Sequence, residues 1–423
     1  MEKPLTGHIT GDGPVSLKEY RDKGGYSGVH RALKELSPGE ITELIKKSNL
    51  LGRGGAGFPA GVKWSLMPTD SDKVKQNYLI CNADEMEPGT FKDRYLLERN
   101  PHQLIAGMIV ASYAVQASKA YIFLRWAYKK AEKILKSAIS EAYQAGYLGK
   151  NILGSGFDLD LYIHISAGRY ICGEETALLN SLEGKRAIPR TKPPFPAVSG
   201  LFGHPTVVNN VETLSWVSHI VDKGPDWFKG LSLTETGGTK LFGVSGRVKK
   251  PGLWELPLGI SVRELLEEYA GGMADGYTFR GLLPGGASTD FLVEEHLDTK
   301  MDFSTVAAAG SRLGTGTMII LDDKTCPVAF VRNIENFFAL ESCGWCTPCR
   351  EGLPWVEKML SSIEDGTGRM NYLDLLKSQA DYMGPGHTFC AHAPGAAEPL
   401  QSALKYFYDD FVKHINEKKC PWR

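Results

Sequence analysis

The chain has 423 residues, and its 48 lysines and arginines nearly balance its 49 aspartates and glutamates, which leaves a formal net charge of −1 at pH 7. This balance gives no reason to expect a nucleic acid or an anionic membrane as a partner. The length suggests about three domains, and the first residues, MEKPLTGHIT, lack the apolar region of a secretory signal. The chain also has eight cysteines. Without a secretory signal, clustered cysteines are expected to bind metal rather than to form disulfides.

The first half of the chain combines helical and strand patterns. Residues 1–50 read as helical, and Ser37, Pro38 and Glu40 have the spacing of a helix capping box. A long apolar helix is expected from Asn100, but its apolar run is too short to span a bilayer. Buried strands are predicted at 76–81, 120–126 and 159–166, with helices at 128–145 and from Gly173. Because strands alternate with helices, the pattern predicts βαβ units and a mostly parallel sheet.

The pattern changes in the second half. A proline-rich loop spans 188–205, and residues 208–213 are predicted to begin another helix. Near residue 230 the composition shifts. A small α+β unit is predicted there, with a helix at 261–270 and strands at 239–246, 253–259, 278–283 and 317–322. From residue 327 onward strand signals vanish, so the fold class is multidomain α/β with an all-α C-terminal part.

A glycine-rich loop, GRGGAGFPAGVKWSLMP, occupies residues 52–68. Glycine lets backbone N–H groups approach a ligand where a Cβ would clash, and such loops bind phosphate when a nest of amides lies behind them. Gly52, Gly54 and Gly57 also form a G-x-G-x-x-G pattern. A dinucleotide fingerprint, however, follows a strand and opens a helix, whereas this loop follows a helical pattern. The loop alone indicates either a ligand-binding segment or a surface turn.

The strongest metal signal is a C-x2-C-x2-C run, formed by Cys343, Cys346 and Cys349. Three thiolates in so short a segment suit an iron–sulfur cluster whose fourth ligand is a distant cysteine. Zinc sites more often use two separated C-x2-C pairs, so the spacing favours iron and sulfur. Cys390 is the preferred fourth ligand because it lies inside the same helical region. Cys420 is close to the chain end, and Cys326 precedes the run.

Carboxylates follow two of the predicted strands: Asp84, Glu85 and Glu87 after the first, and Glu174 and Glu175 after the third. Ligands of parallel sheets bind beyond the carboxyl ends of the strands, so these acids could meet in one crevice. Each acid alone could equally be a helix N-terminal residue favoured by the macrodipole. Together they would accept ribose or ribityl hydroxyls and repel a 2′-phosphate, so the site should prefer NADH to NADPH. If Glu85 provides this repulsion, Glu85→Gln should raise the relative oxidation of NADPH.

Amide, lysine and aromatic side chains complete the candidate site. Amides can pair with both the donor and the acceptor edge of an isoalloxazine ring, and a lysine can hold a phosphate or stabilise a reduced flavin. The candidates are Asn82, Asn209, Asn210 and Lys63. Two aromatic rings in Gly- and Pro-rich contexts could stack on nicotinamide or adenine, or else pack in the core. These are Phe58 and Phe195.

Taken in order, these motifs resemble one family, the NADH-binding, FMN-carrying subunit of bacterial respiratory NADH:quinone oxidoreductase (complex I). The resemblance rests on the glycine-rich loop and on CNADEMEPGTFKDR at 81–94, YICGEETALLNSLEG at 170–184, RTKPPFPAVSGLFGHPTVVNNVETL at 190–214 and ESCGWCTPCREG at 341–352. LFGVSGRVKKPG at 241–252 resembles the ubiquitin-like β-grasp domain of that family. The resemblance covers nearly the whole chain.

The resemblance implies four parts: an N-terminal helical region with the glycine-rich loop at 1–60, a Rossmann-like FMN- and NADH-binding domain at 61–230, a ubiquitin-like β-grasp domain at 231–325 and a C-terminal all-α [4Fe–4S] bundle at 326–423. It implies that FMN is lined by Gly52, Arg53, Gly54, Lys63, Asn82, Asp84, Tyr170, Gly173, Glu174, Asn209 and Asn210. The dinucleotide would face Gly55, Phe58, Glu85, Glu87, Glu175 and Phe195, with Glu85 and Glu175 modulating the cavity. The cluster would be held by Cys343, Cys346, Cys349 and Cys390.

The implied activity is that of an NADH dehydrogenase, with hydride transfer from NADH to FMN and single electrons leaving through the [4Fe–4S] cluster toward quinone. The hard chemistry belongs to the cofactors, so no acid–base triad and no catalytic residue is expected of the protein. The implied partners are a small [2Fe–2S] subunit and the larger iron–sulfur subunit of complex I. The implied location is the cytoplasmic peripheral arm of an inner-membrane complex, without direct membrane insertion.

Two other interpretations stay open from the sequence. The diaphorase subunit of an NAD-reducing hydrogenase or formate dehydrogenase shares these motifs, although such chains are often fused to further cofactor domains. A non-catalytic scaffold would use the cysteines for structural zinc and the glycine-rich loop as a turn. A yellow-brown protein that bleaches with NADH would exclude the scaffold.

Overall fold

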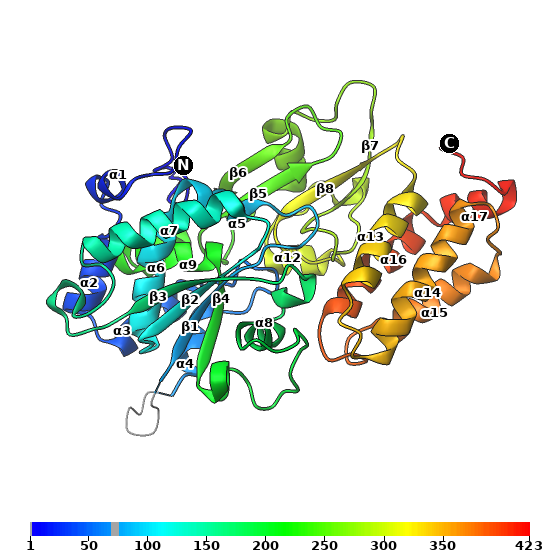
Figure 1. The fold of residues 1–423 in the computed structure, drawn as a ribbon. Coiled ribbons are helices and arrows are strands. Elements are labelled where there is room, and N and C mark those ends of the chain that lie inside the picture. Colours follow the sequence, from blue (N-terminus) through cyan, green and yellow to red (C-terminus); the bar gives the residue numbers. More distant parts are fainter. Residues whose placement is uncertain (1, 69–75) are drawn as a thin grey trace.

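The computed structural model describes residues 2–68 and 76–423, and its first unit is built on a four-stranded sheet (Figure 1). The strands lie in the order β3-β2-β1-β4 and span Tyr78–Ala83 (β1), Lys119–Leu124 (β2), Asp160–Ile165 (β3) and Thr206–Asn210 (β4). All three strand pairs are parallel, so the predicted parallel sheet is confirmed. The carboxyl ends of the four strands therefore meet at one edge.

The prediction of a helix over 208–213 is wrong at its start. Residues 206–210 form β4, which pairs with β1, and the helix α9 spans Val211–Lys223. Asn210 ends the strand and caps the helix, because its side chain accepts a hydrogen bond from the backbone N–H of Glu212. The strand is short and is followed directly by a helix cap and a helical pattern, so the sequence alone predicts a helix over these residues.

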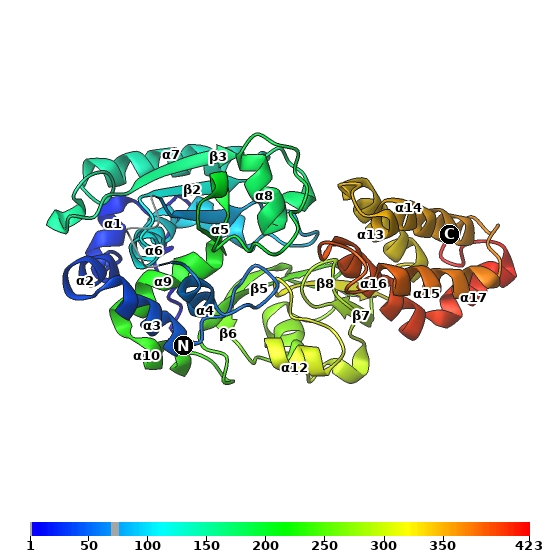
Figure 2. The ribbon, with the colours of Figure 1, turned by 90° about the horizontal axis from the view of Figure 1, so that it is seen from below.

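Helices cover both faces of this sheet (Figure 2). α6 (Pro101–Ala114), α7 (Lys129–Gln144) and α9 share one apolar core with α2 (Ser27–Glu35) and α3 (Pro38–Ser48). On the other face packs α8 (Glu175–Leu182), which follows the short helix η2 (Tyr170–Gly173). α6 and α9 cross closely, since a Cβ on Gly107 would lie 1.8 Å from the carbonyl oxygen of Leu214. The predicted capping box at the start of α3 is present. The remaining α-helices of this unit are α1 (Leu17–Asp22), α4 (Ala60–Ser65), α5 (Lys92–Arg99) and α10 (Pro225–Gly230), and its other short helices are η1 (Ile152–Gly154) and η3 (Leu201–Gly203).

The second unit is a four-stranded mixed sheet in the order β6-β5-β8-β7. Its strands are β5 (Thr239–Ser245), β6 (Gly252–Pro257), β7 (Phe279–Leu283) and β8 (Thr317–Asp322). β5 pairs with β6 antiparallel and with β8 parallel, and β7 pairs with β8 antiparallel. Its short helices include α11 (Val262–Glu264), η4 (Leu265–Tyr269) and α12 (Phe303–Ala308). The predicted α+β composition of this region is confirmed.

The last part of the chain is helical, as expected, and lies beside the second sheet (Figure 2). Its helices are α13 (Pro327–Glu341), α14 (Thr347–Glu364), α15 (Asn371–Met383), α16 (His392–Tyr406) and α17 (Tyr408–Glu417). They bury one continuous apolar core of their own. Across residues 2–68 and 76–423, no helix combines the length and the apolar character that a bilayer crossing needs.

A buried ionic network joins the first unit to the second sheet. One carboxylate oxygen of Glu212, at the start of α9, lies 2.9 Å from Lys92 Nζ and 3.0 Å from Lys240 Nζ. The other oxygen accepts a hydrogen bond from the backbone N–H of Leu241 at 2.9 Å. Although burial pushes the pKa of Glu212 upward, Lys240, Lys92 and Arg53 together lower it to about 2. Glu212 is therefore a buried, ionised carboxylate held among cations.

Candidate functional site

The glycine-rich loop packs against the carboxyl end of β4. A Cβ on Gly54 would lie 3.1 Å from the Cβ of Asn210, tighter than side chains usually pack. Gly57 has a φ of +67°, and a Cβ there would come within 2.6 Å of the Phe303 ring. The backbone N–H of Gly52 donates to the carbonyl of Phe58 at 3.0 Å, which closes the loop. The loop thus forms a cradle at the sheet edge that larger residues would fill.

Arg53 belongs to this loop, and its side chain is fully buried. Its Nη2 donates to the carbonyl oxygen of Gly237 at 2.7 Å, and its backbone N–H donates to Thr213 Oγ1 at 2.8 Å. Its Nε and Nη1 have no hydrogen-bond partner in the described part of the chain. A guanidinium with two unused donors beside a glycine cradle has the chemistry to bind an anion such as a phosphate.

The two acidic segments converge at the ends of β1 and β3, as the sequence predicts. Asn82 Nδ2 donates to the carbonyl oxygen of Gly173 at 3.1 Å, and Ser166 Oγ donates to Asp84 Oδ1 at 2.9 Å. Asp84 Oδ2 is buried and has no partner within residues 2–68 and 76–423. Burial raises the pKa of Asp84 to about 6, against the opposing hydrogen bond from Ser166. One acceptor therefore remains available to a ligand hydroxyl or N–H group.

Glu85 is bound inside the first unit by its neighbours. Its carboxylate accepts hydrogen bonds from the backbone N–H groups of Asp93 and Arg94, at 2.8 and 3.0 Å, in the first turn of α5. Tyr128 donates its hydroxyl to the same carboxylate at 2.8 Å. Burial raises the pKa of Glu85 to about 7, and the neighbouring Asp93 acts in the same direction. This is the helix N-terminal role that the sequence left open for each acid.

Glu87 connects the first unit to the second sheet. It accepts a hydrogen bond from the hydroxyl of Tyr170 at 2.6 Å and one from the backbone N–H of Ser288 at 2.7 Å. A Cβ on Gly286 would lie 2.5 Å from the Glu87 side chain, so glycine makes room for it there. Burial raises the pKa of Glu87.

Glu174 and Glu175 have different surroundings. Glu174 caps α8, because its side chain accepts hydrogen bonds from the backbone N–H groups of residues 176 and 177. Glu175 pairs with Lys63 Nζ at 2.6 Å and with Lys192 Nζ at 3.0 Å. Burial pushes the pKa of Glu175 upward, but the two lysines outweigh it and lower the pKa. Lys63 also donates to the carbonyl of Val208 at 2.9 Å, which fixes this pair at β4.

The amide and aromatic candidates differ in exposure. Asn209 is buried and accepts a hydrogen bond from Trp64 Nε1 at 2.9 Å. Phe58 and Phe195 are 51% and 57% exposed. Each ring therefore has an exposed surface on which a planar ligand can stack. The space around Gly55 is also open, because a Cβ there would meet nothing within 4 Å.

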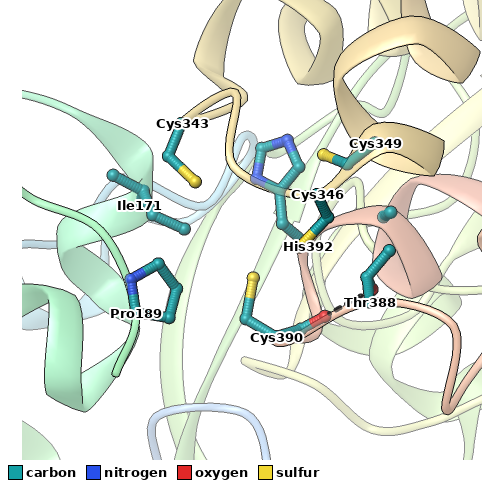
Figure 3. A pocket seen from close by; sticks show the side chains of 9 residues that line it. Ile171, Pro189, Cys343, Cys346, Cys349, Thr388, Cys390 and His392 are labelled. Atoms are coloured by element: carbon teal, nitrogen blue, oxygen red, sulfur yellow. Dashed lines mark hydrogen bonds between the residues drawn. The ribbon is translucent and has the colours of Figure 1, made fainter. Parts of the chain in front are cut away.

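Four cysteines face one cavity beside the first unit (Figure 3). Cys343 and Cys346 precede α14, Cys349 lies in its first turn, and Cys390 precedes α16. The cavity is completed by Ile171, Pro189, Thr388, His392 and Ala393. Ile171 and Pro189 belong to the first unit, so the cavity lies where that unit meets the helices. The structure thus brings together the four cysteines that the sequence singles out.

η2 contacts both the acidic group and the cysteine cavity. The hydroxyl of Tyr170 donates to Glu87, and its backbone N–H donates to Glu341 at the end of α13 at 2.9 Å. Its ring packs edge-on against His392 with centroids 5.4 Å apart, while the next residue, Ile171, lines the cysteine cavity. One turn of chain therefore separates the two sites.

The sequence contains no pattern that singles out His392 or Lys192. His392 Nε2 donates to the carbonyl of Phe338 at 2.8 Å, which fixes the ring at the cysteine cavity. Lys192 lies in the proline-rich loop and reaches back to the acids that begin α8. Both positions depend on contacts between segments far apart in the chain.

Comparisons with known proteins divide the chain into the same three parts as the fold: the first unit, the second sheet and the helical part. Family models match residues 45–219 (Nuo51 FMN-binding domain), 241–291 (SLBB domain) and 329–414 (NADH-ubiquinone oxidoreductase-F iron-sulfur binding region). The chain is 56% identical over 415 residues to the NADH-quinone oxidoreductase F subunits of Salmonella typhimurium and Escherichia coli, covering 98% of this chain and 93% of each relative. The chain belongs to the family of NADH-quinone oxidoreductase F subunits. It is an NADH dehydrogenase subunit that carries FMN and a [4Fe–4S] cluster, oxidises NADH and passes electrons through the cluster.

The fold of this chain is also found in a hydrogenase. Crystal structures of an NAD+-reducing [NiFe]-hydrogenase, in the H2-reduced and air-oxidized states, superpose on this chain with a TM-score of 0.83 and 35% identity. The matches cover 98% and 97% of this chain, and 68% and 67% of the hydrogenase chains.

The residues present fit both cofactors of the F subunits. The cradle at Gly54, the unused donors of Arg53 and the unpartnered oxygen of Asp84 offer the space, cation and acceptor that a flavin nucleotide needs. Four thiols on one cavity provide the ligand set of a [4Fe–4S] cluster.

Proposed function

We propose that this chain is the electron-input end of a respiratory complex I, with FMN and NADH at the strand ends of the first sheet and the [4Fe–4S] cluster in the cysteine cavity. The observation that supports this arrangement best is η2, which contacts Glu87 on one side and lines the cysteine cavity on the other. A hydride carries two electrons, whereas a cluster accepts one at a time, so the flavin and the cluster need to be near neighbours.

The proposed roles follow from the contacts of each side chain. When bound, FMN supplies the conversion of a hydride into single electrons. Asp84 would accept a hydrogen bond from a hydroxyl of FMN, and Arg53 would donate to the FMN phosphate. Lys63 holds Glu175 through their ion pair. Tyr170 packs between the two sites and keeps water from the space between them. The proposed FMN residues are Gly52, Arg53, Gly54, Lys63, Asn82, Asp84, Tyr170, Gly173, Glu174, Asn209 and Asn210, and the proposed dinucleotide residues are Gly55, Phe58, Glu85, Glu87, Glu175 and Phe195. The proposed cluster ligands are Cys343, Cys346, Cys349 and Cys390.

The finer assignments of fold and assembly are part of the same proposal. The first sheet with helices on both faces is Rossmann-like, and the mixed second sheet is a ubiquitin-like β-grasp. The proposed domain bounds are 1–60, 61–230, 231–325 and 326–423. The partners are a small [2Fe–2S] subunit and the larger iron–sulfur subunit of complex I, in the cytoplasmic peripheral arm of an inner-membrane complex.

Membership of complex I is favoured over a hydrogenase diaphorase by coverage and identity. The chain covers 93% of its F-subunit relatives at 56% identity, but only 68% of the hydrogenase chain at 35% identity. The hydrogenase chain therefore has a third of its length outside the match. A diaphorase role is tested by asking which partner subunit accepts electrons from the purified chain.

Anaerobic titration with NADH tests the proposed function. FMN accepts two electrons and the cluster one, so complete reduction should take about 1.5 NADH per chain. Absorbance should show flavin bleaching, and electron paramagnetic resonance should show a reduced [4Fe–4S] signal. A colourless protein containing structural zinc and consuming no NADH would overturn the proposal.

Glu175→Gln should raise the ratio of NADPH to NADH oxidation, measured as kcat/KM, by about tenfold, which corresponds to ~1.4 kcal/mol. Glu175 is the acid that two lysines hold in ionised form, and its removal leaves Lys63 and Lys192 without this carboxylate partner. Lys63, without this partner, would then favour a 2′-phosphate that the carboxylate repels, while Lys192 keeps its pair with Glu174.

Glu85→Gln is the matched comparison for this prediction. The Glu85 carboxylate already accepts hydrogen bonds from two helix N–H groups and a tyrosine hydroxyl. Its replacement therefore tests whether an acid more enclosed than Glu175 repels the 2′-phosphate of NADPH. A raised NADPH ratio in the Glu85 variant alone would assign the discrimination to Glu85. An unchanged ratio in both variants would refute carboxylate repulsion altogether.

A further inference from the structure

A second group of metal-ligating side chains lies apart from the cysteine cavity. Cys326, His414 and Cys420 place two thiol sulfurs and an imidazole nitrogen within 4.8 Å of one another. All three are buried, with exposed fractions of 7%, 0% and 5%. None of them lines the cavity of the other four cysteines. Among the described residues, no fourth Cys, His or acidic side chain joins this group.

The imidazole is oriented as a ligand. Its Nδ1 donates to the backbone carbonyl of Asp410 at 2.6 Å, so the lone pair is on Nε2. Nε2 lies 3.3 Å from the sulfur of Cys326. Trp422 stacks on the ring with centroids 5.7 Å apart and a plane angle of 15°, which fixes it from one face. A hydrogen bond from Nδ1 to a backbone carbonyl is the usual outer contact of a metal-binding histidine.

The group joins three segments of the fold. Cys326 caps the start of α13, directly after β8, while His414 lies in α17 and Cys420 in the C-terminal segment (Figure 1). The indole N–H of Trp422 donates to the carbonyl of Asp323 at 3.2 Å, and the guanidinium of Arg280, from β7, lies 5.4 Å from the Trp422 ring. The C-terminal end of the chain is thus fixed at the junction between the second sheet and the helices.

We propose that Cys326, His414 and Cys420 bind a second metal ion, Zn²⁺, with a water in the fourth position. Zn–S bonds of about 2.3 Å and Zn–N bonds of about 2.0 Å at tetrahedral angles place sulfur and nitrogen about 3.5 Å apart, close to the spacing already present. Each zinc displaces two thiol protons to solvent, so that two thiolates balance the 2+ charge. A neutral unit of this kind suits an apolar, buried position.

The bound ion would close the C-terminal part of the chain. It connects the first residue before α13 to the segment after α17, so it links the two ends of the helical region. A link between residues so far apart in the chain removes more conformational entropy from the unfolded state than a link between near neighbours. Zinc carries no redox chemistry, so the ion adds stability without offering electrons another acceptor.

The experiment uses the full, untagged chain with FMN and its [4Fe–4S] cluster in place. The chain is incubated with Zn²⁺ alone and freed of excess by gel filtration, and metals are then measured by mass spectrometry. We expect one zinc per chain in addition to the cluster iron. X-ray absorption at the zinc edge should show two sulfurs, one imidazole nitrogen and one water oxygen in the first shell. That element-selective measurement does not depend on any variant.

Variants separate this site from the iron cluster. Cys420→Ser and His414→Gln should each weaken zinc binding by more than about 100-fold, since even outer-shell changes cost 10–100-fold. They should lower the melting temperature by about 5 °C and leave the iron content unchanged. Cys81→Ala, which removes a buried thiol in β1, should keep the zinc.

Four results would overturn the proposal, and three of them come from the wild-type chain. These three are wild-type chain without zinc after incubation, a zinc first shell of nitrogen and oxygen alone, and a Cys326–Cys420 disulfide in the purified protein. Loss of iron instead of zinc in the His414 variant would also contradict a separate site.

Discussion

Glu212→Gln should lower the free energy of unfolding by about 3–5 kcal/mol, because it leaves buried cations without their shared carboxylate. Lys92 and Lys240 both contact one oxygen of Glu212, at 2.9 and 3.0 Å, and all three side chains are buried. A glutamine can still accept the hydrogen bond from the backbone N–H of Leu241, so the change isolates the charge. Denaturant unfolding of the full chain measures the effect.

Two further variants test the cause of this loss. Glu43→Gln removes an exposed carboxylate that pairs with Lys46, and it should cost less than about 1 kcal/mol. The double variant Glu212→Gln/Lys240→Met removes one charge of each sign, so it should be more stable than the single Glu212 variant. Additive losses in the double variant, or a single-variant loss below about 1 kcal/mol, would contradict the electrostatic explanation.

The acid dependence of stability provides an independent check of Glu212. Its pKa is lowered from 4.5 to about 2 in the folded chain, so the unfolded state binds the proton more readily. The stabilisation by Glu212 is therefore complete above its unfolded pKa and is lost as the pH falls toward about 2. We expect the stability difference between wild type and Glu212→Gln to shrink over that range.

The regular elements near the site follow from local sequence rules. Ser37 and Glu40 form the capping box that their spacing predicts, and the strands at the centre of the first sheet are apolar runs bounded by turn residues. β4 is the exception, because it runs directly into the cap at Asn210 and the helix α9, so its residues look like the start of that helix. Only pairing with β1, a contact over more than a hundred residues, identifies it as a strand.

The candidate site was predictable where chemistry depends on residue type and spacing. The four cysteines line one cavity. The segments after β1 and β3 also meet, through the hydrogen bond from Asn82 to the carbonyl of Gly173. The individual partners could not be read from the sequence. Glu85 is held by the first turn of α5 and by Tyr128, and Lys192 reaches Glu175 from a separate loop. Cys326 and Cys420 are isolated in the sequence, and only folding brings them to His414.

Cys346→Ser should abolish the [4Fe–4S] cluster and leave FMN bound. The thiol of Cys346 lines the cavity with three other cysteines and accepts the backbone N–H of Phe389 at 3.4 Å, next to Cys390. A hydroxyl is a much poorer ligand for iron than a thiolate, whereas the flavin residues belong to the first sheet. Iron should fall from about four per chain to background, and NADH consumption in the anaerobic titration should fall from about 1.5 to about 1 per chain.

Cys326→Ser is the matched control, because Cys326 lies outside the cavity and should keep all of the iron. Spin resonance of the NADH-reduced variants decides the assignment, since the flavin alone gives no [4Fe–4S] signal. A normal cluster signal in Cys346→Ser would remove Cys346 from the ligand set. Loss of flavin together with iron would instead show that the cavity supports the first unit as a whole. In that case η2, fixed to both sides through Glu87 and Glu341, is the element that transmits the damage.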